Sequence, residues 1–324
     1  MPSSRQILLF DTLFHQSIPE HVYTYPLALP PTTPPIPLRK YGAHGLSYAS
    51  VLSSVSSYLQ KPEQEVNIVV AHLGSGASVC AIKNGKSYDT SMGLTPLDGL
   101  PGGTRSGSID PALVFHHTPA SSEAVDFKGT RLCRGEMLLN KYGEIFCHFI
   151  MDYRNNFLIN FREAGFAALT GTSDFRTITT RAWPKKNDSV RPEDEYAAKL
   201  AYNLFLDRII NYVSSYVVKI LGTPSPNSSR PPSLDGIVFS GGIGEKSVEL
   251  RRDVTAYFKW LGVEIDDEKN ASASAGKEGN DDQNVFLISK DDSKFGIFMC
   301  LTVSFLPLTV QLCHPRTMLR SQFS

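Results

Sequence analysis

The sequence lacks an excess of charge of either sign. Its 32 Lys and Arg residues balance its 32 Asp and Glu residues, so the formal net charge is zero. Phosphate backbones and anionic lipids attract proteins through surplus positive charge, which this composition does not supply. We therefore expect no nucleic-acid partner.

Closely paired cysteines are also lacking. The chain has an odd number of cysteines, and they are scattered: Cys80, Cys133, Cys147, Cys300 and Cys313. Zinc ribbons and dithiol redox motifs need Cys-x-x-Cys pairs, and secreted disulfide frameworks usually have an even number of cysteines. The sequence favours a reducing compartment, and we expect the cytoplasm.

Long apolar runs are rare. The run at residues 7–10 is too short for the apolar region of a secretory signal. Between Lys294 and Arg316 the chain carries no formal charge, which by length alone is typical of a membrane span. Pro307 and the strand-favouring residues of this segment argue against a helix there. We do not expect membrane insertion, and a membrane-tethered protein stays an alternative hypothesis.

What the sequence does contain is an alternation of strand and helix patterns in 324 residues, enough for two domains of ordinary size. Periodicity and turn signals predict a short buried strand at 7–10 and a Pro-rich connection at 26–37. They also predict a helix at 47–59, strands at 66–71 and 77–82 followed by an Asn84-Gly85 hairpin, a helix around 206–220 ending at Gly222, a strand at 234–240 and a surface loop at 268–284. This order predicts an α/β fold.

Three glycine-bearing turns are the first candidates for chemistry. They lie at residues 72–76, 102–107 and 241–245, and the first and third directly follow predicted strands. Glycine lets backbone N–H groups approach a phosphate closely, and Arg105 in the second turn could bind a phosphate through two hydrogen bonds. Each turn alone is more often an ordinary tight turn than a binding site, and none is a Walker A or dinucleotide motif. Together they predict phosphate or nucleotide binding.

Seven segments in a fixed order carry a family resemblance. They are FDTLFH at 10–15, RKYGAHG at 39–45, AHLGSGAS at 71–78, TPLDGL at 95–100, GTRSGSIDP at 103–111, TGTSDFR at 170–176 and FSGGIGE at 239–245. In this order they closely resemble the acetate kinases of the acetokinase family, and the flanking sequence is similar to fungal members. The resemblance runs from about Phe10 to Ser289.

The resemblance implies a fold and a reaction. The fold would be α/β, the actin-like ATPase (ribonuclease H-like) fold, with the C-terminal lobe largely present and the N-terminal lobe mostly missing. The reaction would be the reversible transfer of a phosphoryl group from ATP to acetate, giving ADP and acetyl phosphate, with Mg²⁺ as the metal and acetyl-CoA biosynthesis as the context. A homodimer is the expected assembly. The apolar wall that would distinguish acetate from propionate or butyrate is not identifiable.

The resemblance also implies residue roles. The catalytic residues would be Asp11, His44 and Arg105, with the last two stabilising the charge that spreads over a migrating phosphoryl group. The other interpretations are a strand-end cap for Asp11 and a surface salt bridge for Arg105. The implied ATP-binding residues are His72, Leu73, Gly74, Ser75, Gly76, Asp174, Phe175, Arg176, Gly242, Ile243, Gly244, Glu245 and Lys246. We assign no metal ligand, and His15, His116 and His117 are interpreted as structural or surface histidines.

The sequence departs from the family pattern in three places. We interpret residues 1–40 as a remnant of the N-terminal lobe with a Pro-rich connection and 41–294 as the nucleotide-binding lobe. Residues 142–162 would be an anomalous insert and 295–324 an atypical tail. A second hypothesis is therefore a catalytically inactive fragment or an incorrect gene model, and we expect little or no activity from the chain as written.

Both anomalous segments begin inside a similar tripeptide, directly after its lysine. Lys141 and Lys294 are each followed by an aromatic residue and a glycine, and suitable codons for these residues spell a GT-initial intron donor. We interpret both segments as intron sequence translated in error. Left in the protein, the first would insert a loop rich in Phe and Ile before Asp174. The second would replace a C-terminal strand and helix with an uncharged run that exposes apolar surface and promotes aggregation.

Reverse-transcription PCR across the two junctions tests this interpretation. We expect a shortened product in which the codon for Lys141 is joined in frame to that for Glu163. Transcripts that retain both segments as the dominant species would refute it.

Overall fold

A six-stranded mixed sheet organises the part of the chain that the computed structural model describes, which is residues 9–28, 34–111, 113, 124–127, 130–133, 164–186, 188–222, 233–275 and 284–302. The strands lie in the order β3-β2-β1-β6-β8-β7. They are β1 (Ile68–Leu73), β2 (Ala77–Lys83), β3 (Lys86–Thr90), β6 (Gly236–Ser240), β7 (Val285–Leu287) and β8 (Gly296–Cys300). β1, β6 and β8 run parallel, whereas β2, β3 and β7 are antiparallel to their neighbours.

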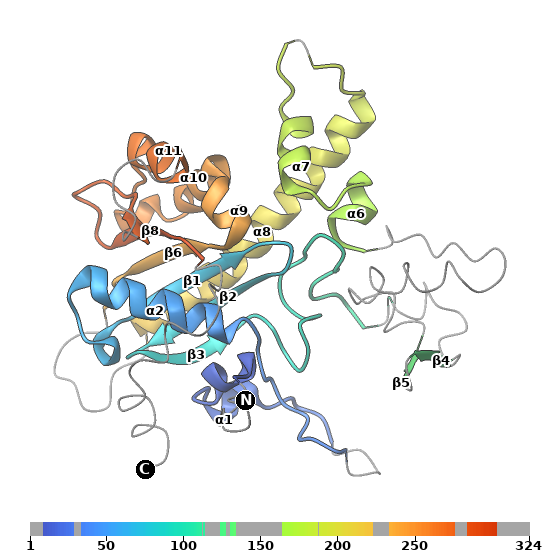
Figure 1. The fold of residues 1–324 in the computed structure, drawn as a ribbon, viewed down its shortest axis with the longest axis vertical. Coiled ribbons are helices and arrows are strands. Elements are labelled where there is room, and N and C mark those ends of the chain that lie inside the picture. The colour runs from blue at the N-terminus through green and yellow to red at the C-terminus, as the bar shows by residue number, and fades with distance from the viewer. Residues whose placement is uncertain are drawn as a thin grey trace, which may run out of the picture.

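Helices cover both faces of this sheet (Figure 1). α2 (Gly45–Leu59) packs on one face, where it shares a core with Ile68 and Val70 of β1. α8 (Pro192–Gly222) packs on the other face, where it shares a larger core with Val69 and Ala71. Because successive residues of a strand point to opposite faces, a strand covered on both sides is apolar at every position, as β1 is from Ile68 to Ala71.

The remaining elements surround the sheet. α9, α10 and α11 gather near β6 and β8, and α6 and α7 lie near the N-terminal half of α8 (Figure 1). Their bounds are η1 (Asp11–His15), α1 (Glu20–Tyr23), η2 (Glu63–Glu65), α6 (Gly165–Thr170), α7 (Phe175–Ala182), α9 (Gly241–Lys246), α10 (Val248–Ala256), η3 (Lys259–Leu261) and α11 (Asp267–Ala275). β4 (Ala124–Phe127) and β5 (Thr130–Cys133) form a separate two-stranded sheet.

Most of the predicted elements are confirmed within a few residues. The predicted helix at 47–59 is α2, and the strands predicted at 66–71, 77–82 and 234–240 are β1, β2 and β6. The hairpin between β2 and β3 turns at Asn84 and Gly85, whose φ angles of 50° and 70° are the left-handed pair of a type I′ turn. α8 ends at Gly222 as predicted.

Two local predictions are wrong. Leu9 and Phe10, the described part of the predicted strand at 7–10, are exposed and precede the 3₁₀ helix η1. Apolar composition alone cannot make a strand where no neighbour supplies hydrogen bonds. The predicted loop at 268–284 begins instead with α11, because Asp266 accepts hydrogen bonds from the backbone N–H groups of Glu268 and Lys269 and so caps the helix.

The expectation of an atypical tail after Lys294 is also corrected, because this segment begins with a strand of the sheet. This strand is β8, which pairs in parallel with β6 and antiparallel with β7, and Ile297 and Met299 are fully buried. A central strand that completes both cores is integral to the fold, so the interpretation of this segment as intron sequence fails for residues 295–302. The expected insert at 142–162 lies outside the described residues. No helix in the described ranges is both long and apolar enough to cross a membrane.

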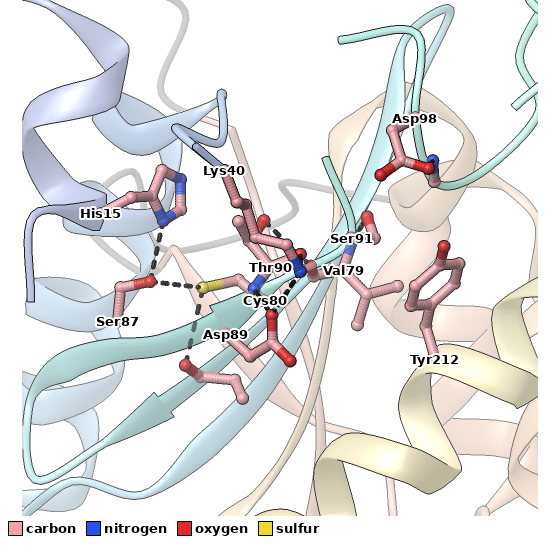
Figure 2. Close-up of polar contacts among 12 residues, drawn as sticks. His15, Lys40, Val79, Cys80, Ser87, Asp89, Thr90, Ser91, Asp98 and Tyr212 are labelled. Atoms are coloured by element: carbon pink, nitrogen blue, oxygen red, sulfur yellow. Dashed lines mark hydrogen bonds and ion pairs between the residues drawn. The ribbon is translucent and has the colours of Figure 1, made fainter. Parts of the chain in front are cut away.

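A buried carboxylate ties the N-terminal segment to the sheet and to α8. Asp89 on β3 is 3% exposed and forms ion pairs with Lys40 at 2.8 Å and Lys219 of α8 at 2.5 Å. Lys40 also donates to the carbonyl oxygen of Thr90, as Figure 2 shows. Two cations compensate the desolvation of one carboxylate, and the three segments are thereby fixed to one another.

A buried arginine joins α9, α10 and α11. Arg251 of α10 is fully buried and donates to the carbonyl oxygens of Gly244 and Glu245, both at 2.7 Å. It also donates to Asn270 Oδ1 at 2.7 Å and to Ser274 Oγ at 2.6 Å. Burial lowers the pKa of Arg251 to about 10, so the side chain is still charged at neutral pH.

Replacing Arg251 should therefore destabilise the fold strongly. We expect Arg251→Met to lower the free energy of unfolding by about 3–5 kcal/mol, because several buried acceptors lose their donor. Urea unfolding followed by circular dichroism measures it. The neighbouring Arg252 is 48% exposed with long ion pairs, so Arg252→Met should cost no more than about 1 kcal/mol. Equal losses in the two variants would contradict this account.

Candidate functional site

Two of the three glycine turns lie side by side at one edge of the sheet. β1 and β6 are parallel neighbours with His72 opposite Ser240, so the turns that follow them leave the sheet together. A Cβ on Gly74 would lie 4.0 Å from the backbone nitrogen of Gly242, whereas one on Gly242 would meet no atom within 4 Å. The open space beside Gly242 is therefore lined by backbone.

Glycine is required where these turns meet. Gly241 has a φ of 78°, and a Cβ there would lie 2.6 Å from the carbonyl oxygen of Leu73. A larger residue would be strained in this conformation and would push the two turns apart. The sequence pattern of the third turn is thus explained by the close approach of β1 and β6.

Arg105 and His44 converge on the first glycine turn. A Cβ built on Gly76 would lie 2.4 Å from Arg105 Nη2 and 3.4 Å from His44 Nε2. Two side chains far apart in the sequence thus meet at one backbone position. Both present nitrogen atoms there, which suits the recognition of an oxyanion.

Arg105 is held without a carboxylate partner. Its side chain donates from Nη1 to the carbonyl oxygen of Pro96 at 2.7 Å, and the residue is 6% exposed. Among the described residues no acidic group lies within ion-pair distance of it. Burial lowers the pKa of Arg105, yet a guanidinium keeps its charge in proteins. A nearly buried cation without a counter-ion is a candidate anion site, and the surface salt bridge considered for Arg105 is wrong.

His44 occupies a strained position at the start of α2. Its φ of 60° lies in the left-handed region, which non-glycine residues seldom adopt. His44 Nδ1 lies 2.8 Å from Ser78 Oγ on β2, and the ring lies 4.5 Å from that of His72. The strain and the contacts together fix the direction of the ring.

His15 supports the loop that carries His44. Its Nε2 donates to the carbonyl oxygen of Ala43 at 2.9 Å, so its Nδ1 accepts from Ser87 at 2.8 Å. Figure 2 shows the His15 ring and Ser87 together beside β3. Burial lowers the pKa of His15, so the ring is neutral. Its interpretation as a structural histidine is confirmed, whereas His116 and His117 lie outside the described residues.

Asp11 lies against the beginning of the same helix. Its Oδ1 accepts a hydrogen bond from the backbone N–H of Leu46 at 3.2 Å. A Cβ on Gly45 would collide with the carbonyl oxygen of Asp11, so glycine at this position permits the contact. Asp11 begins η1 and is not at the end of a strand, so the strand-end cap considered for it is wrong.

His72, at the end of β1, completes this cluster. Its Nδ1 lies 2.9 Å from Ser47 Oγ, which belongs to α2. Burial lowers the pKa of His72, although the negative charges of Glu245 and Asp11 oppose the shift. His72 is thus a neutral group in contact with His44, and it adds no second cation to that of Arg105.

The segment from Asp174 to Arg176 lies elsewhere. Asp174 caps α7 by accepting from the backbone N–H groups of Arg176 and Thr177, and the bonds from Thr177 lower the pKa of this carboxyl. The ring of Phe175 is buried in the main core. A Cβ on Gly103 would lie 3.0 Å from Ser173 Cβ, which places the start of α7 beside the Arg105 loop. Within the described part of the chain, no hydrogen bond or ring contact joins this segment to His72.

The remaining candidates lie on α9. The carbonyl oxygens of Gly244 and Glu245 are held by Arg251, and the carboxylate of Glu245 accepts hydrogen bonds from the backbone and hydroxyl of Thr302. Sequence reasoning missed Arg251, Tyr48 and Ser78. The signals for Ser78 were its place as the last residue of the motif at 71–78 and its polar side chain between apolar neighbours of a predicted strand.

Among the described residues no group of three or more His, Cys, Asp or Glu side chains is arranged to hold a metal ion. Mg²⁺ often binds through one or two carboxylates together with substrate phosphates and water. The carboxylate of Asp11, which lies at the start of α2, is compatible with that kind of site.

The chain is similar to proteins of one family. The sequence pattern of the Acetokinase family matches residues 1–131 and 152–304. The unmatched stretch between these ranges overlaps the expected insert at 142–162 only in part, and the match extends past Lys294. A probable acetate kinase of Cryptococcus neoformans var. neoformans is 47% identical over 91% of this chain and 60% of the relative. One from Emericella nidulans is 40% identical over 93% of this chain and 62% of the relative.

Solved structures agree with these relatives. The acetate kinase of Porphyromonas gingivalis superposes with a TM-score of 0.64 at 29% identity, and a propionate kinase of Francisella tularensis with a TM-score of 0.62 at 31% identity. Each superposition covers 91% of this chain and 60% of the solved chain. The chain therefore spans about 60% of the length of the proteins that it matches, and its described part has the actin-like ATPase fold.

Proposed function

The chain belongs to the acetokinase family, and on that premise we propose that it supplies the nucleotide-binding lobe of an acetate kinase. The reaction is the reversible transfer of a phosphoryl group from ATP to acetate, giving ADP and acetyl phosphate. The observation that carries the proposal is the convergence of Arg105 and His44 on Gly76, at the sheet edge where two glycine turns meet.

The geometry suits phosphoryl transfer. In such a transfer negative charge spreads over the equatorial oxygens of the migrating group, and fixed donors aimed at those oxygens lower the barrier. We assign this role to the guanidinium of Arg105 and to an N–H of His44. Because Arg105 has no carboxylate partner among the described residues, its charge is available to an anion.

The glycine turns would bind the phosphates of the nucleotide. Gly74, Ser75 and Gly76 follow β1, and Gly242 faces open space beside them. His72, Leu73, Ile243, Gly244, Glu245 and Lys246 would shape this cradle, and Asp174, Phe175 and Arg176 would contact the adenosine side. We assign the nucleotide-binding lobe to residues 41–294 together with β8.

Mg²⁺ would enter with the nucleotide and offset the negative charge of its phosphates. We assign Asp11 as the carboxylate that would hold it, since it lies at the start of α2, the helix that follows His44. The cytoplasm as location is supported by the scattered cysteines, and a homodimer by the family. Acetate is the acceptor that we favour, and acetyl phosphate would serve acetyl-CoA biosynthesis.

A binding and an activity measurement test the proposal. Calorimetry with ADP and Mg²⁺ on the 324-residue chain should detect binding, and a hydroxamate assay with ATP should detect acyl phosphate formation by the protein translated from the spliced transcript. Acetate and propionate are compared in parallel. A chain that folds but binds neither ADP nor ATP would overturn the proposal.

Arg105→Ala should lower kcat by about 10²–10³-fold in the hydroxamate assay, with a much smaller change in the KM for ATP. The reason is that the contact of the guanidinium strengthens as charge develops in the transition state. Arg105→Lys should restore little activity, because an ammonium cannot form the same paired hydrogen bonds. A change in KM alone would show that Arg105 only binds the nucleotide.

Gly76→Ala tests the convergence itself. The new methyl group would displace the guanidinium of Arg105, which is the flexible end of a side chain, so the fold should survive while kcat falls by about tenfold or more. Gly222→Ala is the matched control, because a Cβ there meets nothing within 4 Å. Equal activity of the two variants would contradict the convergence of Arg105 and His44 at Gly76.

A further inference from the structure

A polar contact behind His44 is not explained by the proposed function alone. Tyr48 and Ser78 are both fully buried, one on α2 and the other on β2, and their hydroxyl groups contact each other. Ser78 Oγ also lies 2.8 Å from His44 Nδ1. The three residues therefore form a continuous chain of hydrogen bonds that ends at the ring of His44.

The hydroxyl protons of Tyr48 and Ser78 give this series of hydrogen bonds a direction. A buried phenol must donate its proton, and among the described residues Ser78 is the only hydrogen-bond partner of the Tyr48 hydroxyl. Burial raises the pKa of Tyr48 well above its usual value, so the group remains protonated. The oxygen of Ser78 is thus an acceptor from Tyr48.

The hydroxyl proton of Ser78 is then available for a single hydrogen bond. Within the described part of the chain, the other hydrogen-bond partner of its hydroxyl is His44 Nδ1, so Ser78 donates to that nitrogen. A neutral imidazole whose Nδ1 accepts a hydrogen bond carries its proton on Nε2. Nε2 is the atom next to the Cβ position of Gly76, beside Arg105.

We propose that Tyr48 and Ser78 are positioning residues that hold neutral His44 in the tautomer with the proton on Nε2, so that an N–H donor faces the position where Arg105 meets Gly76. The purpose of this donor rests on the proposed function, whereas the tautomer itself does not. Without this hydrogen-bond relay from Tyr48 through Ser78 to His44, the Ser78 hydroxyl could rotate and accept a hydrogen bond from a protonated Nδ1. Nε2 would then be an unprotonated acceptor that repels a phosphoryl oxygen.

The backbone around His44 supports the same conclusion. The left-handed φ of His44 is maintained by its neighbours, since its carbonyl oxygen accepts from the backbone N–H of Tyr48 at 3.0 Å and the preceding carbonyl, of Ala43, accepts from His15. A residue held in a sparsely populated conformation has its side-chain direction set in advance. The relay adds the one feature that backbone geometry does not determine, the position of the proton.

Nuclear magnetic resonance of the 324-residue chain with ¹⁵N-labelled histidine tests the tautomer directly. Spectra are recorded at about pH 8, above the usual titration range of histidine, and the His44 signals are assigned from their loss in His44→Gln. In the unmodified protein we expect the proton on Nε2. In Ser78→Ala and Tyr48→Phe we expect a measurable fraction of the Nδ1-protonated form, and Ser78→Thr should restore the original signal.

Tyr216→Phe is the matched control. Tyr216 is also a buried tyrosine, but its hydroxyl has no hydrogen-bond partner among the described residues, so the His44 signals should not change. A proton on Nδ1 in the unmodified protein would overturn the proposal. So would Ser78→Ala spectra in which the tautomer of His44 is unchanged.

Kinetics separate this proposal from the proposed function. With the protein from the spliced transcript, Ser78→Ala and Tyr48→Phe should lower kcat by about 3–10-fold, the kinetic equivalent of one neutral hydrogen bond, with little change in the KM for ATP. If the spectra change as expected but the protein transfers no phosphoryl group, the relay is correct and the proposed function fails. If activity falls in Ser78→Ala while the tautomer is unchanged, the relay is refuted.

Discussion

The parallel pairing of β1 with β6 is the constraint on which the candidate site depends. Parallel neighbours end at the same edge of a sheet, so the turns after Leu73 and Ser240 must leave it together. Only glycine at position 241 allows the second turn to approach the carbonyl oxygen of Leu73. The same pairing places His72 next to Ser240, so the glycine turns that follow the two strands begin side by side.

The burial of both faces of the sheet explains why the chemistry lies at its edge. α2 and α8 cover β1 and β2 so completely that their apolar side chains are out of contact with water. Polar groups inside such a sheet must find partners within the protein. Ser78 does so through Tyr48 and His44, and Asp89 does so through Lys40 and Lys219, which also fixes the N-terminal segment against the sheet.

The family explains this arrangement of residues, but the chain covers only part of the length of its relatives. The described residues form a fold shared with acetate and propionate kinases at about 30% identity, while the chain spans about 60% of those proteins. The glycine turns, Arg105 and His44 lie within the matched ranges, as does β8. The proposed nucleotide binding and phosphoryl transfer both rest on this matched part of the chain.

The sequence alone determined the local structure, and it did so because the signals were local. Alternating burial is unnecessary in strands covered on both faces, so β1, β2 and β6 were visible as short apolar runs, and Asn84-Gly85 set the hairpin through its own backbone preferences. The ordered motifs likewise gave the family and the candidate residues Asp11, His44 and Arg105.

Tertiary structure decided everything that depends on partners distant in sequence. β8 looked like an atypical tail because its charge-free composition suggests a membrane or an error, and only pairing with β6 and β7 makes it a core strand. A surface interpretation of Arg105 was open until its burial, with no counter-ion among the described residues, was visible. Tyr48 carried no motif signal, and Ser78 was only the last residue of the motif at 71–78, so neither was assigned a role. A hydrogen-bond relay between a helix and a strand exists only when folding brings their hydroxyl groups together.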